Sequence, residues 1–157
     1  RFGLQRFIQQ ACLCGVDGVV IPDLPVEEAA DLIKVAKKKK FATIFLLAPT
    51  SDLRRIKEVS AKSSGFIYYV SLTGTTGARV ALPKELSAEL RRIKRITAKP
   101  VCVGFGISTP EQAKKIARVA DGVIVGSAII KVIEKNLGRK DLTAKVTNFV
   151  RRLKQAI

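Results

Sequence analysis

The chain has 157 residues, of which 47% are hydrophobic, yet none of its apolar runs approaches the roughly 20 residues that a membrane-spanning helix needs. We therefore expect a soluble, cytoplasmic protein with a single domain over residues 1–157. The formal charge of +16 suggests nucleic-acid binding, but the basic residues fall on the polar faces of predicted helices without interleaved aromatic residues. Solvated lysines and arginines are the simpler interpretation, and a basic nucleic-acid-binding module stays open as an alternative.

The three cysteines do not form a metal-binding pattern. Cys12 and Cys14 lie two residues apart on a predicted helix, which places them about 200° apart around its axis. Cys102 is isolated in a predicted strand, and the chain has no histidine. We therefore predict no metal site, and we expect reduced thiols that are buried as small hydrophobic groups.

The chain opens on a predicted helix and continues as alternating strands and helices. Five apolar runs rich in β-branched residues predict strands at residues 16–21, 42–47, 66–71, 101–104 and 122–125. Each run is nearly continuous in hydrophobicity, which is typical of parallel strands covered on both faces. The segments between them have helical periodicity, with predicted buried faces at Ala29, Leu32, Ile33 and Ala36, at Leu53, Ile56 and Val59, at Leu86, Leu90 and Ile93, and at Ala113, Ile116, Ala117 and Ala120.

Local signals mark where several helices begin and end. Ser108 offers an N-cap, Pro110 suits a first helical turn, and Glu111 stands three residues after Ser108. Gly15 and Gly138 predict C-terminal stops. These signals support the order of strands and helices read from hydrophobicity.

Two glycine-containing segments, at residues 103–108 and 125–130, each join a predicted strand to the start of a helix. Free backbone N–H groups in a first helical turn favour a dianion, and glycine lets phosphate oxygens approach the backbone closely. In (β/α) barrels the loops after the last two strands commonly bind phosphate. The pair of segments therefore predicts a phosphate site.

Five parallel strands fit either a doubly wound sheet or part of an eight-stranded barrel. A doubly wound domain usually begins with a strand whose following turn binds the ligand, whereas this chain begins with a helix and has its glycine-rich turns near the end. We therefore predict an α/β fold that is a partial (β/α)8 TIM barrel. It would contain about five βα units, strands 4 to 8, and lack the N-terminal strands 1 to 3.

Five stretches resemble, in order, the fourth to eighth strand-loop units of the tryptophan synthase alpha subunit: residues 15–28, 47–51, 69–78, 104–108 and 126–130. The resemblance implies a carbon–carbon lyase of tryptophan biosynthesis that cleaves indole-3-glycerol phosphate to indole and glyceraldehyde 3-phosphate. It also implies an α2β2 complex with a beta subunit that holds pyridoxal phosphate, while the alpha chain itself needs no cofactor. Another phosphate-binding barrel, such as a sugar-phosphate isomerase or epimerase, stays open as an alternative.

The resemblance also implies roles for individual residues. It places the substrate phosphate on Gly77, Gly106, Gly126 and Ser127, the indole ring against Tyr68 and Phe105, loop closure at Thr76, and the partner interface at Asp23 and Pro25. Leu72 stands where some relatives have arginine, which leaves the details of loop closure open.

The chemistry needs a base for the glycerol hydroxyl and an acid for the indole ring. The family uses a glutamate and an aspartate, which we expect upstream of Arg1, so no catalytic residue is predicted in this segment. Asp23 is the carboxylate predicted directly at a strand end, and Asp52 fits a helix cap better. We therefore expect the isolated chain to be inactive. Five strands would leave two open sheet edges and an exposed half-core, which predicts poor independent stability or pairing through those edges.

Overall fold

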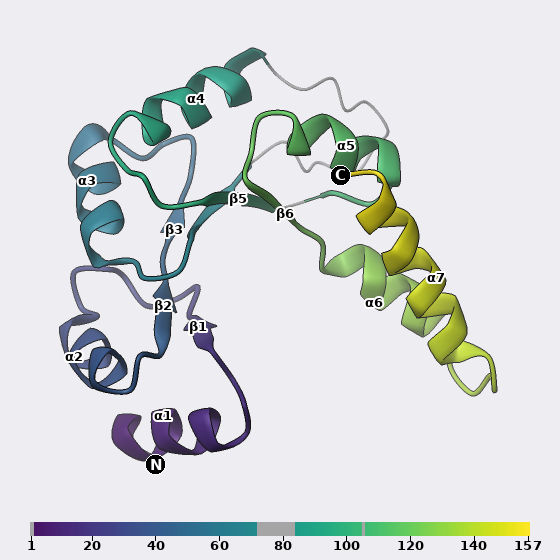
Figure 1. Cartoon of the computed structure of the whole chain (residues 1–157), viewed down its shortest axis with the longest axis horizontal. Helices are drawn as coiled ribbons and strands as arrows, with labels where there is room; N and C mark the ends of the chain where they lie inside the picture. The colour runs from purple at the N-terminus through teal and green to yellow at the C-terminus, as the bar shows by residue number, and fades with distance from the viewer. Residues whose placement is uncertain (1, 72–83, 105) are drawn as a thin grey trace.

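A computed structural model describes residues 2–71, 84–104 and 106–157 of the chain. Strands and helices alternate along most of its length (Figure 1). In chain order the elements are α1 (Leu4–Leu13), β1 (Gly18–Val20), α2 (Ala30–Lys38), β2 (Ala42–Ile44), β3 (Leu46–Leu47), α3 (Leu53–Lys62), β4 (Ile67–Val70), α4 (Lys84–Lys94), β5 (Val101–Gly104), α5 (Pro110–Ala117), β6 (Gly122–Ile124), α6 (Ser127–Glu134) and α7 (Leu142–Gln155).

All described strand pairs are parallel, and they follow the order of the sequence. β1 pairs with β2, and β3, β4, β5 and β6 pair in that order. The strands form an arc with α2, α3, α4 and α5 along its outer side (Figure 1). Because each helix connects two neighbouring parallel strands, this is the arrangement of consecutive units of a (β/α) barrel.

The strand predicted at residues 42–47 is divided in the structure at Phe45. The residues before Phe45 pair with β1, and those after it pair with β4. The Phe45 carbonyl still accepts the N–H of Tyr68 at 3.1 Å, and its side chain is buried in the core. The prediction of one uninterrupted strand was therefore wrong, because hydrophobicity does not show where a strand exchanges one partner for another.

The main core lies between the sheet and the helices. Four strand residues on the outer face of the sheet are fully buried, namely Ile67, Tyr69, Val101 and Val103. The largest fully buried helix side chains of the same core are Ile56 and Val59 of α3 and Leu90 and Ile93 of α4. The predicted helix faces are largely confirmed. Leu53 is the exception at 49% exposed, because it is the first residue of α3, beyond the end of the packed face.

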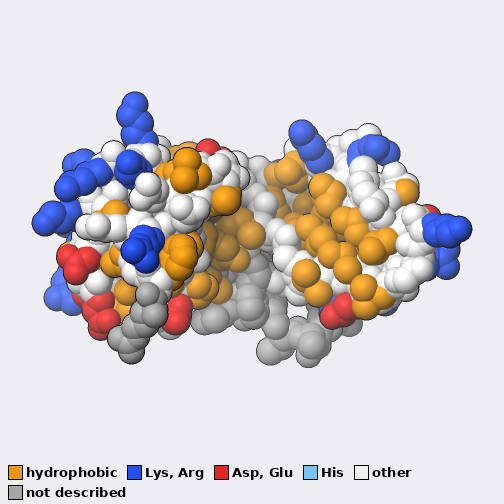
Figure 2. Space-filling view, turned by 90° about the horizontal axis from the view of Figure 1, so that it is seen from below, with side chains coloured by type: hydrophobic (Ala, Val, Ile, Leu, Met, Phe, Trp, Pro, Cys, Tyr) orange, Lys and Arg blue, Asp and Glu red, His pale blue; other side chains and the backbone are white. Residues whose placement is uncertain are grey.

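The inner face of the sheet is only partly covered. Along β4, buried Ile67 and Tyr69 alternate with half-buried Tyr68 and Val70. Hydrophobicity predicted strands covered on both faces, which was wrong for this face, whereas the exposed half-core expected from five strands is present. In the described part of the chain, β1 and β6 each pair with one strand, so the predicted open edges are present. Figure 2 shows hydrophobic side chains on both sides of a hollow, with Lys and Arg towards the outer surfaces.

The thiols are less buried than predicted. Cys14 is exposed, and Cys12 and Cys102 are half-buried. Cys14 is the C-cap of α1, where Gly15 with a φ of 79° ends the helix as predicted. Burial raises the pKa of the Cys102 thiol, and the nearby Asp121 carboxylate adds to that shift.

Candidate functional site

The N-terminus of α6 is open at the end of β6. Gly126 is the N-cap, and among the residues that the structure describes no side chain caps the helix there. The Gly126 carbonyl accepts the N–H groups of Ile129 and Ile130 at 2.9 and 3.2 Å, which starts the helix. Gly126 and Ser127 are exposed, and a Cβ placed on Gly126 would meet no atom of the described residues within 4 Å. The first-turn amides therefore have room for an anion, which the helix dipole would favour.

The N-terminus of α5 is capped by its own side chains. Thr109 is the N-cap, and its hydroxyl accepts the Gln112 N–H at 3.3 Å. The Gln112 side-chain oxygen accepts the N–H groups of Ser108 at 2.7 Å and Thr109 at 3.2 Å. The predicted cap at Ser108 with Glu111 was therefore one residue early. Pro110 occupies the first helical position, which makes the residue directly before it the N-cap.

The capping box limits which amides of this loop can bind a ligand. The N–H groups of Ser108 and Thr109 are already used within the chain, so neither is free to bind a ligand. Gly106 is exposed and has a φ of 76°, a conformation that favours glycine. The two predicted segments thus differ: α6 offers an open helix terminus, and the loop after β5 offers a tight turn.

Tyr68 lies across Gly104 on the neighbouring strand. A Cβ on Gly104 would lie 2.3 Å from the Tyr68 hydroxyl and 2.6 Å from its ring carbon Cζ. The ring therefore occupies the space that a side chain at Gly104 would need. Burial raises the pKa of the Tyr68 phenol. Sequence reasoning missed this role for Gly104, because only the strand register brings the two residues together.

Asp23 and Pro25 lie exposed on the loop after β1, at residues 21–29. Val26 on the same loop is fully buried, and its carbonyl accepts the Lys62 ammonium at 3.2 Å. Glu27 forms an ion pair with Arg55 of α3, and this contact lowers the Glu27 pKa. The loop is thus attached to α3, with Asp23 and Pro25 facing away from the core.

The predicted residues that the structure describes belong to strand-loop units that open at one edge of the sheet. Because the strands are parallel, the loops after β1, β4, β5 and β6 all leave from the carboxyl-terminal edge. Tyr68, Gly106, Gly126 and Ser127 belong to neighbouring strand-loop units there, whereas the loop of Asp23 lies at the other end of the arc. Gly77, Thr76 and Phe105 lie outside the described residues.

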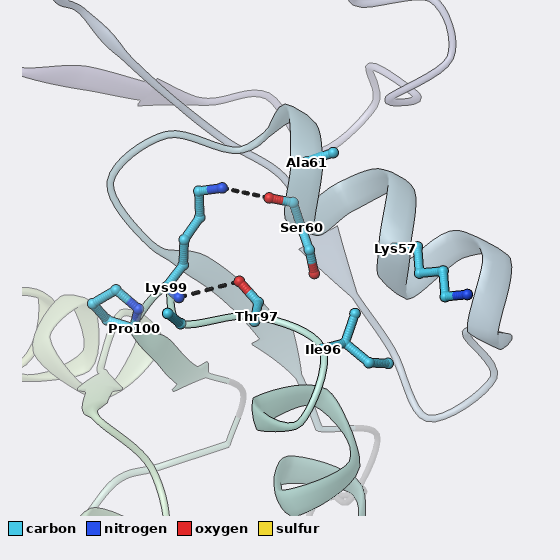
Figure 3. Close-up of a pocket in the computed structure, with 8 residues that line it drawn as sticks. Lys57, Ser60, Ala61, Ile96, Thr97, Lys99 and Pro100 are labelled. Atoms are coloured by element: carbon cyan, nitrogen blue, oxygen red, sulfur yellow. Dashed lines mark hydrogen bonds between the residues drawn. The ribbon is translucent and has the colours of Figure 1, made fainter.

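A hollow of about 700 Å³ lies at the opposite edge, between α3 and the turn before β5 (Figure 3). The Lys99 ammonium donates to the Ser60 carbonyl, and the Lys99 N–H donates to the Thr97 hydroxyl at 3.1 Å. Lys57 extends away from these groups (Figure 3). Barrel enzymes carry out their chemistry at the carboxyl-terminal edge, so this hollow is not the predicted substrate site.

Two features, a metal-binding cluster and a membrane-spanning helix, are absent from the described ranges of the chain. No cluster of three or more His, Cys, Asp or Glu side chains there is arranged to hold a metal ion. No helix there has both the length and the apolar character required to cross a bilayer.

The fold and site define an α/β protein of the TIM-barrel class, here a partial barrel, with an open helix N-terminus at its carboxyl-terminal edge. The chain belongs to the tryptophan synthase alpha chain family, whose model matches residues 1–157. It is 48% identical over 155 residues to the tryptophan synthase alpha chain of Geotalea daltonii, covering 99% of this chain and 58% of that relative. The Dehalococcoides mccartyi alpha chain is 47% identical over 157 residues, covering 100% of this chain and 60% of that relative.

Solved structures agree with the family assignment. The alpha subunit of Legionella pneumophila matches with a TM-score of 0.85 and 37% identity, over 99% of this chain and 57% of that one. A chain from the tryptophan synthase α2β2 complex of Pyrococcus furiosus matches with a TM-score of 0.85 and 40% identity, over 98% and 61%. The chain thus spans about three fifths of the length of these relatives, and the match favours this family over the other phosphate-binding barrels.

Proposed function

We propose that this chain takes part in cleaving indole-3-glycerol phosphate to indole and glyceraldehyde 3-phosphate, a retro-aldol lyase reaction of tryptophan biosynthesis. The observation that carries the proposal is the open N-terminus of α6, where exposed Gly126 and Ser127 have no side-chain cap among the described residues. Exposed first-turn amides at the carboxyl-terminal edge of a barrel suit a phosphate dianion. Membership of the tryptophan synthase alpha chain family supports this substrate.

In this proposal the phosphate contacts the amides of Gly106, Gly126 and Ser127, together with Gly77. The indole ring lies against Tyr68, because a flat apolar ring packs well on an aromatic side chain. Phe105 completes the aromatic wall, and Thr76 belongs to a loop that closes over the substrate.

The acid–base pair of the reaction is proposed to come from residues outside these 157. Asp52 caps α3 by accepting the Arg55 N–H at 2.7 Å, as the sequence predicted. Glu27 is paired with Arg55, and Asp23 is exposed on its loop. None of these three forms a pair of carboxylates facing a common substrate position. We therefore expect the chain to be inactive alone and to use no cofactor of its own.

The proposed partner is a tryptophan synthase beta subunit, which would hold pyridoxal phosphate and consume the indole. Asp23 and Pro25 are the proposed contacts. They are exposed on a loop that buried Val26 and the Glu27 ion pair hold against α3. Such a braced loop presents its outer residues to a partner at low entropic cost.

Ser127→Asp tests the phosphate site in the full-length protein. A carboxylate in the first turn of α6 interacts favourably with the helix dipole, so the variant should remain as stable as the unmodified protein. The same carboxylate repels a dianion bound at these amides. We expect glycerol 3-phosphate binding, measured by calorimetry, to weaken about tenfold or more, whereas the uncharged control Ser127→Asn stays within about threefold. Equal binding by Ser127→Asp and the unmodified protein would contradict the proposal.

A further inference from the structure

A second hollow, of about 590 Å³, lies at the amino-terminal edge of the sheet. The turn before β2 contributes Lys40 and Phe41 to its lining, and the turn before β4 contributes Ser63 and Ser64. Since β2 and β4 are parallel strands of the same arc, both turns lie at the edge opposite Gly106 and Gly126. This hollow is therefore separate from the proposed substrate site.

The charged residues that line the hollow are all lysines. Lys62 is engaged, with its ammonium 2.8 Å from a Glu58 oxygen. Lys37 and Lys40 are exposed, and neither has an ion-pair partner within the described parts of the chain. Two unpaired ammonium groups thus stand at one hollow in a chain of net charge +16, which favours an anionic ligand.

Ser63 supplies a second, independent indication of a ligand. Its residue is 3% exposed, and its hydroxyl is buried with no hydrogen-bond partner in the structure. Leaving a buried hydroxyl unpaired costs about 1–3 kcal/mol. The neighbouring Ser64 hydroxyl accepts the Thr43 N–H at 2.9 Å. Rotation of Ser63 about its Cα–Cβ bond towards a ligand oxygen would give its hydroxyl a partner.

The walls of the hollow include apolar groups. Phe41 is 3% exposed, and Ile33 is half-buried against the main core. The combination of ammonium groups, a serine hydroxyl and an apolar wall suits a phosphate attached to a small apolar body better than a bare inorganic ion.

We propose that this hollow binds a small organic phosphate monoester, with its phosphate near Lys37, Lys40 and Ser63 and its apolar part against Phe41 and Ile33. The hollow in Figure 3 shares one of these features, because the Ser60 hydroxyl there is also buried without a partner in the described structure, but its lysines differ. There the Lys99 ammonium already donates to the Ser60 carbonyl, and Lys57 extends away.

Lys40 provides a test that separates binding from stability. It has a φ of 54° in the turn that ends α2, where the Phe41 N–H donates to the Ala36 carbonyl at 3.0 Å. Glycine is the residue that this position favours. Lys40→Gly should therefore raise the melting temperature of the protein while it removes one of the two ammonium groups.

The experiment is an amide chemical-shift titration of the ¹⁵N-labelled full-length protein with phenyl phosphate and, separately, inorganic phosphate. We expect phenyl phosphate to shift the amides of Ser63, Ser64 and Gly65, and to bind more tightly than inorganic phosphate. Shifts confined to the amides near Gly126, or equal affinity for the two probes, would overturn the proposal.

Lysine variants then test which ammonium groups bind the phosphate. The double variant Lys37→Gln with Lys40→Gln should weaken phenyl phosphate about tenfold at this site, and Lys40→Gly should weaken it while the protein melts at a higher temperature. Lys39→Gln is the matched control, because Lys39 is exposed on the same turn but does not line the hollow. An equal loss with Lys39→Gln would show general charge attraction and refute a built site.

Discussion

The close approach of Gly104 and Tyr68 predicts that substitutions at these two positions have strongly non-additive effects on the free energy of unfolding. In Gly104→Ala, the new Cβ would lie 2.3 Å from the Tyr68 hydroxyl, 2.6 Å from Cζ and 2.9 Å from Cε1. All three atoms belong to a rigid phenol that is half-buried on the inner face of the sheet, so the ring or the strand must move. Overpacking of this kind costs about 1–3 kcal/mol.

The same substitution should be harmless once the ring is removed. In a Tyr68→Leu background the three clashing atoms are absent, and φ at Gly104 is not positive, so alanine fits and restricts the unfolded chain. Such a Gly-to-Ala change stabilises by about 0.4–1 kcal/mol. The double-mutant cycle should therefore show a coupling free energy of at least about 1 kcal/mol.

Urea unfolding of the full-length protein, followed by far-ultraviolet circular dichroism, measures all four free energies of unfolding in the cycle. Tyr68→Leu alone serves as the control for loss of the phenol. If the effects of Gly104→Ala and Tyr68→Leu add within about 0.5 kcal/mol, then Tyr68 does not occupy the space above Gly104, and the proposed aromatic wall loses its support.

Substitutions at two further positions test the hydrogen bonds that hold the neighbouring elements in place. Gln112→Ala removes the acceptor of the Ser108 and Thr109 amides and should lower the free energy of urea unfolding by about 1 kcal/mol. An unchanged free energy of unfolding would contradict the capping box. The Asp121 carboxylate accepts the N–H of buried Val101 at 2.9 Å and the Lys94 ammonium at 2.7 Å. Asp121→Ala should therefore lower the free energy of unfolding by about 1–3 kcal/mol. Asp121→Asn should lower it less, because the amide keeps an acceptor. Burial raises the Asp121 pKa, but these two donors outweigh burial and lower the pKa overall. The stability that the charged carboxylate adds is therefore complete at neutral pH and is lost as the pH falls below about 4. A difference in the free energy of unfolding between the unmodified protein and Asp121→Asn that persists at pH 2 would contradict this.

Local sequence patterns predicted the elements that depend on neighbours in the chain. The buried positions of the α3 and α4 helices follow from spacing, and the cap at Asp52 follows from its place before a helical run. The break at Phe45 could not be predicted, because it depends on which strand each half pairs with. The half-exposed inner face follows from the count of five strands, which leaves a half-core exposed, and not from hydrophobicity, which does not tell what covers each side of a strand.

Three described glycines at the candidate site show most clearly what the sequence could not predict, because each occupies its position for a different physical reason. Gly104 leaves space for the Tyr68 ring, and Gly106 has a φ of 76°. Gly126 has neither constraint: its φ is −118°, and an added Cβ would meet no atom of the described residues within 4 Å. Neither the packing nor the backbone conformation of the described chain explains the missing side chain at Gly126. In the proposed function, a phosphate that approaches the first turn of α6 would explain it, and for that reason the proposal depends on Gly126 more than on Gly104 or Gly106.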